Sequence, residues 1–199
     1  MNILAISANF PRLVLALQTE KGCYTAETLD SAVENSLPKL ENLLAEANLK
    51  MSNLDKIFVA AGPGSFTGIR MGFAIAQGAH FLQGIPFFGI SNFQILAQIS
   101  GHKDLLAAIP TGRGDYYAQE FVAGKPLEPN IISLLQVAQS KKLVVGMLDA
   151  ELIKMLQNEK QDFLEIEEIT GSMIIKAASQ LSDNSFISQP LYVRPPYAC

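Results

Sequence analysis

The residues best suited to chemistry lie between positions 57 and 70, where an apolar run leads into a glycine-rich turn and then a helical pattern. The turn reads Gly-Pro-Gly-Ser-Phe-Thr-Gly at residues 62–68, and Arg70 follows it. A strand, a glycine loop and the start of a helix together favour bound anions, so a phosphate site is one interpretation. The loop lacks both the Gly-Lys-Ser/Thr ending of a P-loop and the Gly-x-Gly-x-x-Gly spacing. The alternative is a tight turn whose glycines let the strand and the helix approach closely.

Two polar positions of this segment have expected roles in the helix that follows. Ser65 or Thr67 can cap a helix at residues 68–83 by accepting a hydrogen bond from an amide of its first turn. Arg70 lies in that first turn, where the helix dipole favours anions. We therefore expect Arg70 to have a carboxylate partner, either in this chain or in another.

Other catalytic patterns are sparse. Ser65 directly follows Gly64, so it does not occupy the central position of a Gly-x-Ser-x-Gly nucleophile motif. The chain has two histidines, His80 and His102, which we expect to be a partly buried, hydrogen-bonded helix residue and a loop residue. The glutamates at positions 165, 167 and 168 are more typical of a solvated surface than of an acid/base pair.

Composition limits the classes to which this chain of 199 residues can belong. Hydrophobic residues make up 49% of the chain and charged residues 17%, which excludes disorder as a global description. A net charge of −4 argues against a protein that binds nucleic acid alone through a broad basic face. Cys23 and Cys199 make no disulfide framework, so we expect a reducing compartment. We identify no signal peptide and no membrane span, and therefore expect a soluble cytoplasmic protein.

The elements that must position the glycine-rich turn follow from apolar periodicity in the first half of the chain. Strands are expected at residues 2–7, 12–18, 22–27, 56–60 and 87–90. Helices are expected at residues 30–47, with Asp30 or Ser31 as the cap, at 68–83 and at 93–99. The first three strands, separated by turn residues, indicate an antiparallel meander.

A polar break at residues 101–104 suggests the boundary between two domains, 1–100 and 101–199, with a C-terminal tail that can return to the first. In the second domain, strands are expected at residues 105–109, 116–122 and 143–145, and helices at 133–139, 148–157 and 172–181. The segment Thr111-Gly112-Arg113-Gly114 reads as the turn of a hairpin. The repeated order of hairpin, helix, strand and helix predicts a mixed α/β protein of two related lobes, the second shortened.

The glycine-rich turn also carries a family resemblance. The run Gly62, Pro63, Gly64, Ser65, Phe66, Thr67, Gly68, Ile69, Arg70 resembles that of the TsaB (YeaZ) family of tRNA threonylcarbamoyladenosine biosynthesis proteins. Further matching segments are residues 3–6, Leu37-Pro38, 84–86, 89–91, 113–117 and 190–194. The resemblance implies the duplicated actin-like ATPase (ASKHA) fold to which this family belongs.

The resemblance also implies a protein without its own active site. Actin-like enzymes place a carboxylate at the end of the first strand of each lobe, where magnesium is organised. The corresponding positions here are Ser7 and Pro110, which cannot replace a carboxylate as ligand of a hard cation. Arg113 lies one place later than the arginine of the family pattern, and the His-x-x-x-His helix of the related TsaD enzymes is missing. We therefore expect no catalytic residue, no metal site and no cofactor.

The function implied by the resemblance is that of a non-catalytic scaffold. Such a protein would be required with a TsaD-like transferase, as a heterodimer, for threonylcarbamoylation of the tRNA adenosine next to the anticodon. A TsaE-like ATPase would join the assembly, and tRNA would be contacted only through the complex. The alternative is an actin-like small-molecule kinase or a metal-dependent peptidase, which would need Asp115 or Asp149 to converge on a cleft. A homodimeric regulator that acts without the transferase is a third class.

The two long helices of the first lobe are the expected partner surface. The second helix has apolar residues around most of its circumference, which the sheet of one small lobe cannot easily cover. The resemblance implies that these helices pack against their counterparts on the transferase, and that the same face is available for self-association in its absence. The residues assigned to this interface are Leu37, Leu40, Leu44, Ile69, Phe73 and Ala76.

Overall fold

The computed structural model describes residues 1–8, 12–28 and 32–194. The chain divides into two compact units. The first comprises Met1–Asn92 and Thr170–Leu191, and the second comprises Phe93–Ile169 together with the segment that begins at Tyr192. The expected cap at Asp30 or Ser31 and the residue Cys199 lie outside the described residues.

The first unit is built on a five-stranded sheet with the strand order β3-β2-β1-β4-β5. Its strands are β1 (Ile3–Ser7), β2 (Leu13–Thr19), β3 (Gly22–Thr28), β4 (Lys56–Ala60) and β5 (Phe87–Ile90). The first three strands form the expected antiparallel meander, whereas β4 and β5 run parallel to β1. Parallel neighbours need crossover connections, and these are supplied by two long helices.

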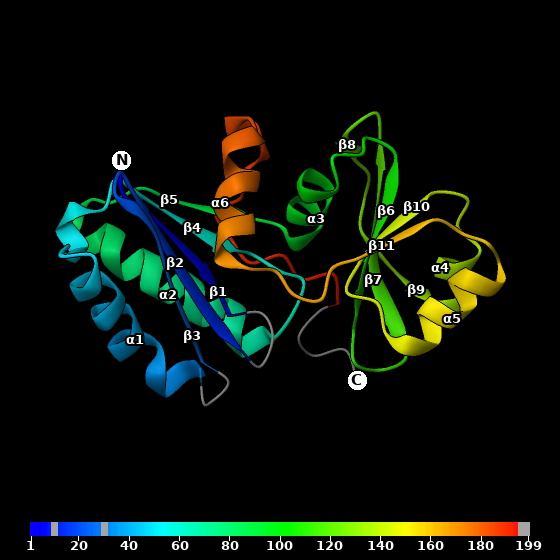
Figure 1. Ribbon diagram of the computed structural model, residues 1–199, viewed down its shortest axis with the longest axis horizontal. Coiled ribbons are helices and arrows are strands. Elements are labelled where there is room, and N and C mark those ends of the chain that lie inside the picture. Colours follow the sequence, from blue (N-terminus) through cyan, green and yellow to red (C-terminus); the bar gives the residue numbers. More distant parts are fainter. Residues whose placement is uncertain (9–11, 29–31, 195–199) are drawn as a thin grey trace. The chain divides into compact units, whose positions relative to one another are not determined.

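Helices cover both faces of this sheet. The helices α1 (Ala32–Glu46) and α2 (Phe66–Gln83) pack on one face, and α6 (Gly171–Gln180) packs on the other (Figure 1). The face under α1 and α2 carries large aliphatic side chains of the sheet, among them Leu4, Ile6 and Leu15. The face under α6 includes Ala16, and a Cβ atom at Gly171 would overlap it. The small residues therefore let α6 lie directly on the sheet.

The second unit is built on a six-stranded sheet with the order β11-β10-β6-β7-β8, in which β9 also pairs with β7. Its strands are β6 (Leu105–Pro110), β7 (Asp115–Val122), β8 (Lys125–Pro126), β9 (Asn130–Ser133), β10 (Leu143–Gly146) and β11 (Phe163–Glu165). The pair β6 and β7 is antiparallel, as is β7 with β9, whereas β10 and β11 continue parallel to β6. The order β9-β7-β6-β10-β11 thus repeats the order of the first sheet.

The helices of the second unit are shorter than those of the first. They are α3 (Asn92–Ser100), α4 (Leu134–Ala138) and α5 (Ala150–Asn158), and 3-10 turns lie at η1 (Met51–Asn53) and η2 (Asp183–Ser185) of the first unit. Ser133 caps α4 and Asp149 caps α5, each through its side-chain oxygen. Tyr116, Val144 and Leu152 lie in the core between these helices and the sheet.

The repeated order confirms the prediction of two related α/β lobes with a shortened second lobe. The predicted strands and helices all occur, and most ends lie within two residues of the expected ones. The sequence patterns missed β8, β9 and β11. These strands are two to four residues long and partly polar, so they are too short for an alternating pattern to be recognised.

Candidate functional site

The glycine-rich turn after β4 is held by hydrogen bonds to its carbonyl groups. The amide of Leu191 donates to the carbonyl of Ala61 at 2.8 Å, and the amide of Asn92 donates to that of Gly62 at 2.7 Å. The side-chain amide of Asn92, which is fully buried, donates to the carbonyl of Pro63 at 2.9 Å. Gly62 has a φ of +102°, and a Cβ there would lie 2.8 Å from the Leu191 oxygen. The turn is therefore fixed by segments that are distant in the sequence.

The start of α2 is capped as the sequence predicts. The hydroxyl of Ser65 accepts a hydrogen bond from the amide of Gly68 at 3.3 Å. A Cβ at Gly68 would overlap the carbonyl of Ala8, the residue that follows β1. Glycine at position 68 thus lets the end of β1 contact the first turn of α2. This packing role supports the tight-turn interpretation, and phosphate binding at the turn stays a prediction.

In the second unit, β6 takes the place of β1, and an ion pair lies beside its end, at the start of β7. Asp115 accepts hydrogen bonds from the hydroxyl of Thr111 and, at 2.6 Å, from Nη2 of Arg194. The Thr111 hydroxyl, followed by the Arg194 guanidinium, holds the pKa of the Asp115 carboxyl below its usual value of 3.8, although partial burial acts in the opposite direction. Arg113 is exposed in the turn between β6 and β7. Asp115 is thus occupied by a contact within its own unit.

Asp149, the other carboxylate that an enzyme would need, also has partners. It accepts a hydrogen bond from the Tyr116 hydroxyl and another from the Leu152 amide at 2.9 Å. Burial, and then Asp149 itself, raise the pKa of Tyr116 far above its usual value. Asp149 lines a hollow of about 310 Å³, together with Pro110, Met147, Leu148, Glu165, Ile166 and Glu167. Asp115 is not among these lining residues, so the two aspartates do not meet in that hollow.

The histidines lie apart from these groups. His80 is in the last turn of α2 with Nδ1 at 3.0 Å from the Ile85 carbonyl, as expected, but the residue is exposed and not partly buried. His102 is exposed in a loop, as expected. Among the side chains that the structure describes, no three His, Cys, Asp or Glu residues lie close enough together to hold a metal ion. The described residues contain no helix with the length and hydropathy needed to cross a membrane.

The residues assigned to a partner interface divide into two groups. Leu37 is 57% exposed on α1. The other five lie in the core of the first unit, buried against its own sheet: Leu40, Leu44, Ile69, Phe73 and Ala76. These five side chains support the two helices from within, and their assignment to an interface stays a prediction.

The exposed surface of α2 carries apolar residues that the interface assignment did not include. Phe81 and Leu82 are 88% and 74% exposed, and Phe66 is 38% exposed. Helical periodicity places Arg70 and Phe81 close together on one side of α2, with Phe66 at the edge of that side next to the buried Phe73. Without knowing which face met the sheet, periodicity could not assign these residues to the outside.

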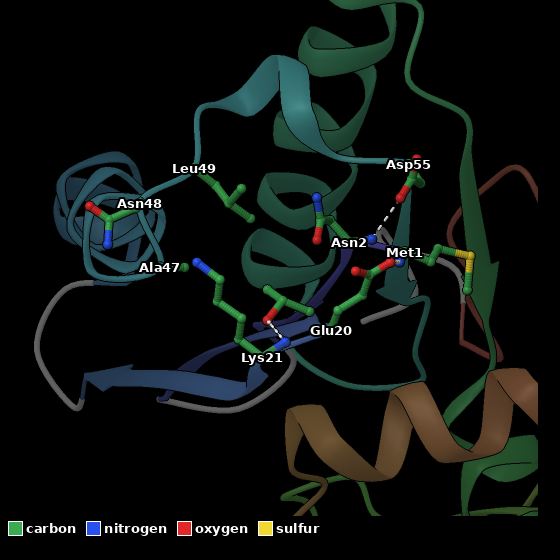
Figure 2. A pocket seen from close by; sticks show the side chains of 9 residues that line it. Met1, Asn2, Glu20, Lys21, Ala47, Asn48, Leu49 and Asp55 are labelled. Atoms are coloured by element: carbon green, nitrogen blue, oxygen red, sulfur yellow. Dashed lines mark hydrogen bonds and ion pairs between the residues drawn. The ribbon is translucent and has the colours of Figure 1, made fainter.

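A second hollow, of about 570 Å³, lies at the opposite end of the first sheet (Figure 2). It is formed by the start of β1, the turn between β2 and β3, and the end of α1. The amino group of Met1 pairs with Glu20 at 3.2 Å, and the amide of Asn2 donates to Asp55 at 2.6 Å. Lys21 extends toward the C-terminal end of α1, where the helix dipole favours a cation. These contacts join the ends of the elements and are remote from the glycine-rich turn.

Comparisons with known proteins agree with the sequence motifs. Residues 16–131, more than half of the chain, match the family model for TsaD, tRNA N6-adenosine threonylcarbamoyltransferase. The tRNA threonylcarbamoyladenosine biosynthesis protein TsaB of Buchnera aphidicola is 31% identical over 132 residues, which are 63% of this chain and 62% of that protein. Matches to three further TsaB proteins cover between 38% and 53% of their length. The chain thus matches about two fifths to three fifths of the length of these curated relatives.

Solved structures show the same architecture. A Pseudomonas aeruginosa protein described as similar to peptidase YEAZ superposes with a TM-score of 0.74 at 20% identity, covering 97% of this chain and 99% of that one. The ethanolamine utilization protein EutJ of Carboxydothermus hydrogenoformans superposes with a TM-score of 0.55 at 11% identity, covering 89% of both chains. These similarities confirm the duplicated actin-like ATPase fold. The matching motifs, the family model and the fold together show that the chain belongs to the TsaD family, in which it groups with the TsaB (YeaZ) proteins.

Proposed function

We propose that this chain is a non-catalytic scaffold that pairs with a TsaD-like transferase in the cytoplasm for threonylcarbamoyladenosine modification of tRNA. The proposal rests chiefly on the match to TsaB proteins, which are named for the biosynthesis of this modified nucleoside. The matched region includes most of the first unit, in which α1 and α2 present exposed apolar residues such as Leu37 and Phe81. In this proposal, a TsaE-like ATPase joins the pair, and tRNA is contacted only through the complex.

Three features of the strand ends support a scaffold over an enzyme. The residue at the end of β1 is Ser7, which is buried and has no carboxylate. The carbonyl of the adjacent Ala8 lies close to Gly68. Pro110 ends β6, where actin-like enzymes need the second carboxylate. Asp115 and Asp149, the carboxylates that an enzyme would need, are engaged by Arg194 and by Tyr116. A polar network that is already satisfied inside one unit is poorly placed to bind a nucleotide metal ion.

The experiment is reconstitution with the TsaD-like transferase of the same organism. Both proteins are purified, mixed, and analysed by sizing with light scattering. The modified nucleoside is then quantified by mass spectrometry in cells depleted of their own TsaB, with and without this chain. We expect a stable heterodimer and restored modification. Absence of a complex together with unchanged modification would contradict the proposal.

A parallel assay separates the scaffold from the enzyme alternative. The purified chain is incubated alone with ATP and magnesium, or with a peptide substrate and a divalent metal. We expect no turnover by the chain alone. Turnover that is lost in Asp149→Asn, with the fold retained by circular dichroism, would instead support an enzyme built around the hollow next to Pro110.

A further inference from the structure

The strand β3 forms an open edge of the first sheet. Among the described residues, this strand of seven residues pairs with β2 alone. Thr19 and Gly22 close the two-residue turn of this hairpin as a bonded pair, and bonded and non-bonded pairs alternate along an antiparallel ladder. The even-numbered residues of β3 therefore bond to β2. The backbone amides and carbonyls that point away from the sheet belong to Cys23, Thr25 and Glu27.

The other strand edges are protected, whereas the edge of β3 is not. Gly89 of β5 is bridged to Ile187 by two backbone hydrogen bonds of 2.8 and 2.9 Å. In the second sheet, the outer strands are only two to four residues long, and β8 contains Pro126. Short strands, prolines and lysines commonly prevent an edge from pairing with another chain. The strand β3 contains neither proline nor lysine, and its one charged residue, Glu27, lies 4.0 Å from Arg12.

The side chains beside this open edge leave room for a further strand. Tyr24 and Ala26 point to the face that α1 covers and pack against the core there. Cys23, Thr25 and Glu27 point to the opposite face and are exposed. On that face, α6 packs against β1, β2 and β4. The exposure of these three side chains shows that no described segment covers the edge from this side.

We propose that β3 pairs antiparallel with β3 of a second copy of this chain, with Thr25 of each copy at the twofold axis. In this register Cys23 faces Glu27 of the second copy, so all the outward backbone groups are paired and no like charges lie directly opposite. A strand of the same sequence thus satisfies the whole edge. The twofold contact uses both edges, so the assembly closes as a dimer. This inference goes beyond the proposed function and does not depend on it.

The test measures self-association of the full chain by sedimentation velocity, from micromolar to millimolar concentration. Thr25→Lys places two ammonium groups directly opposite each other at the axis. It is expected to weaken association by about tenfold or more, because like charges that face each other across a strand pair are destabilising. Ser179→Lys adds the same charge at an exposed position of α6 and is expected to leave association unchanged. Thermal unfolding of each variant checks that the fold is retained.

A crosslinking measurement tests the register without a disruptive substitution. Residues directly opposite each other on paired strands have Cβ atoms about 4.5–5.5 Å apart. Thr25→Cys, combined with Cys23→Ser and Cys199→Ser, is therefore expected to give a covalent dimer with dibromobimane, a short thiol crosslinker. In the control, Cys199→Ser alone, the two Cys23 residues of the dimer lie about 14 Å apart along the paired strands and are expected to stay unlinked.

Loss of association in Thr25→Lys, together with crosslinking at residue 25, supports the inference. A chain that is monomeric at every concentration overturns it, and so does the absence of crosslinking at residue 25. If association survives Thr25→Lys but is lost in Phe81→Glu, the two copies meet through α2 and the inference is wrong. If Thr25→Lys weakens only the binding of the transferase, the edge receives an extended segment of that protein and the inference is likewise wrong.

Discussion

Gly68 and Gly78 lie in the same helix but in opposite surroundings. A Cβ at Gly68 would overlap the carbonyl of Ala8, whereas a Cβ at Gly78 would meet nothing within 4 Å. The first glycine is required by the close approach of β1 and α2. Gly78 is exposed on the outward side of α2, where packing within the unit does not require a glycine.

This contrast predicts opposite effects of the same substitution. Gly68→Ala should lower the free energy of unfolding by about 1–3 kcal/mol or more, because the end of β1 or the start of α2 must move. Gly78→Ala is its matched control and should raise stability by up to about 1 kcal/mol, since alanine is the better helix former. Urea unfolding of both variants measures the difference. Equal effects at the two positions would contradict the close approach at Gly68.

Asp115 makes stability depend on pH. Its pKa is lowered in the folded state by Thr111 and Arg194, so its contribution is fully present above the usual value of 3.8. The contribution is lost as the pH falls below 3.8 toward the lowered pKa. Asp115→Asn should therefore have a lower melting temperature than the unaltered chain at neutral pH, and the difference should shrink in acid.

Thermal unfolding between neutral pH and about pH 3 tests this dependence. Glu128→Gln is the control, because Glu128 is an exposed carboxylate of the same unit. A difference between Asp115→Asn and the unaltered chain that is constant across this range would show that Asp115 does not titrate as the geometry implies.

At the scale of elements, the hydrogen bond between Tyr116 and Asp149 connects β7 to the start of α5. Tyr116 is fully buried, and Asp149 also caps α5 by accepting a hydrogen bond from the Leu152 amide. The short helix α5, of nine residues, thus depends on one side chain both for its cap and for its link to the sheet.

Tyr116→Phe is expected to destabilise the protein by about 1.5–3 kcal/mol, because a buried hydrogen bond to a charged acceptor is lost. Asp149→Asn weakens the same bond, so the double variant should be less destabilised than the sum of the two single variants. Urea unfolding of the four proteins measures this coupling. Strict additivity would contradict a direct interaction.

At the scale of the whole molecule, the first unit is assembled from two parts of the chain that are far apart in sequence. Residues Met1–Asn92 supply the sheet, whereas Thr170–Leu191 supply α6 and the segment that bonds to Ala61 and Gly89. The sheet face under α6 carries small residues such as Ala16, which pack well only when the helix is present.

A fragment of residues 1–100 is therefore expected to lack a cooperative unfolding transition, since one face of its sheet would be uncovered. Joining residues 170–194 to this fragment through a flexible linker should restore the transition. Circular dichroism during thermal unfolding distinguishes the two fragments. If residues 1–100 alone unfold as cooperatively as the joined fragment, α6 is not needed to complete the unit.

Local sequence patterns were sufficient for most elements of the fold. The turn at Thr111 to Gly114, the strand at Lys56 to Ala60 and a helix cap at Ser65 or Thr67 were all predicted, because each depends on interactions within a few residues. The short strands β8, β9 and β11 were missed, because they exist through pairing with neighbours and have little pattern of their own.

By itself, the sequence determined the order of the elements, the repeated lobes and the family, through motifs and through periodicities that are local to each segment. Only the tertiary structure decided which side of α2 meets the sheet, and therefore that Phe73 is buried while Phe81 is exposed. It also decided that Arg70 has no carboxylate partner among the described residues, and that Asp115 is paired with Arg194. The physical reason is that burial and charge pairing depend on which distant segments meet in space, and helical periodicity in a nearly all-apolar helix does not specify this.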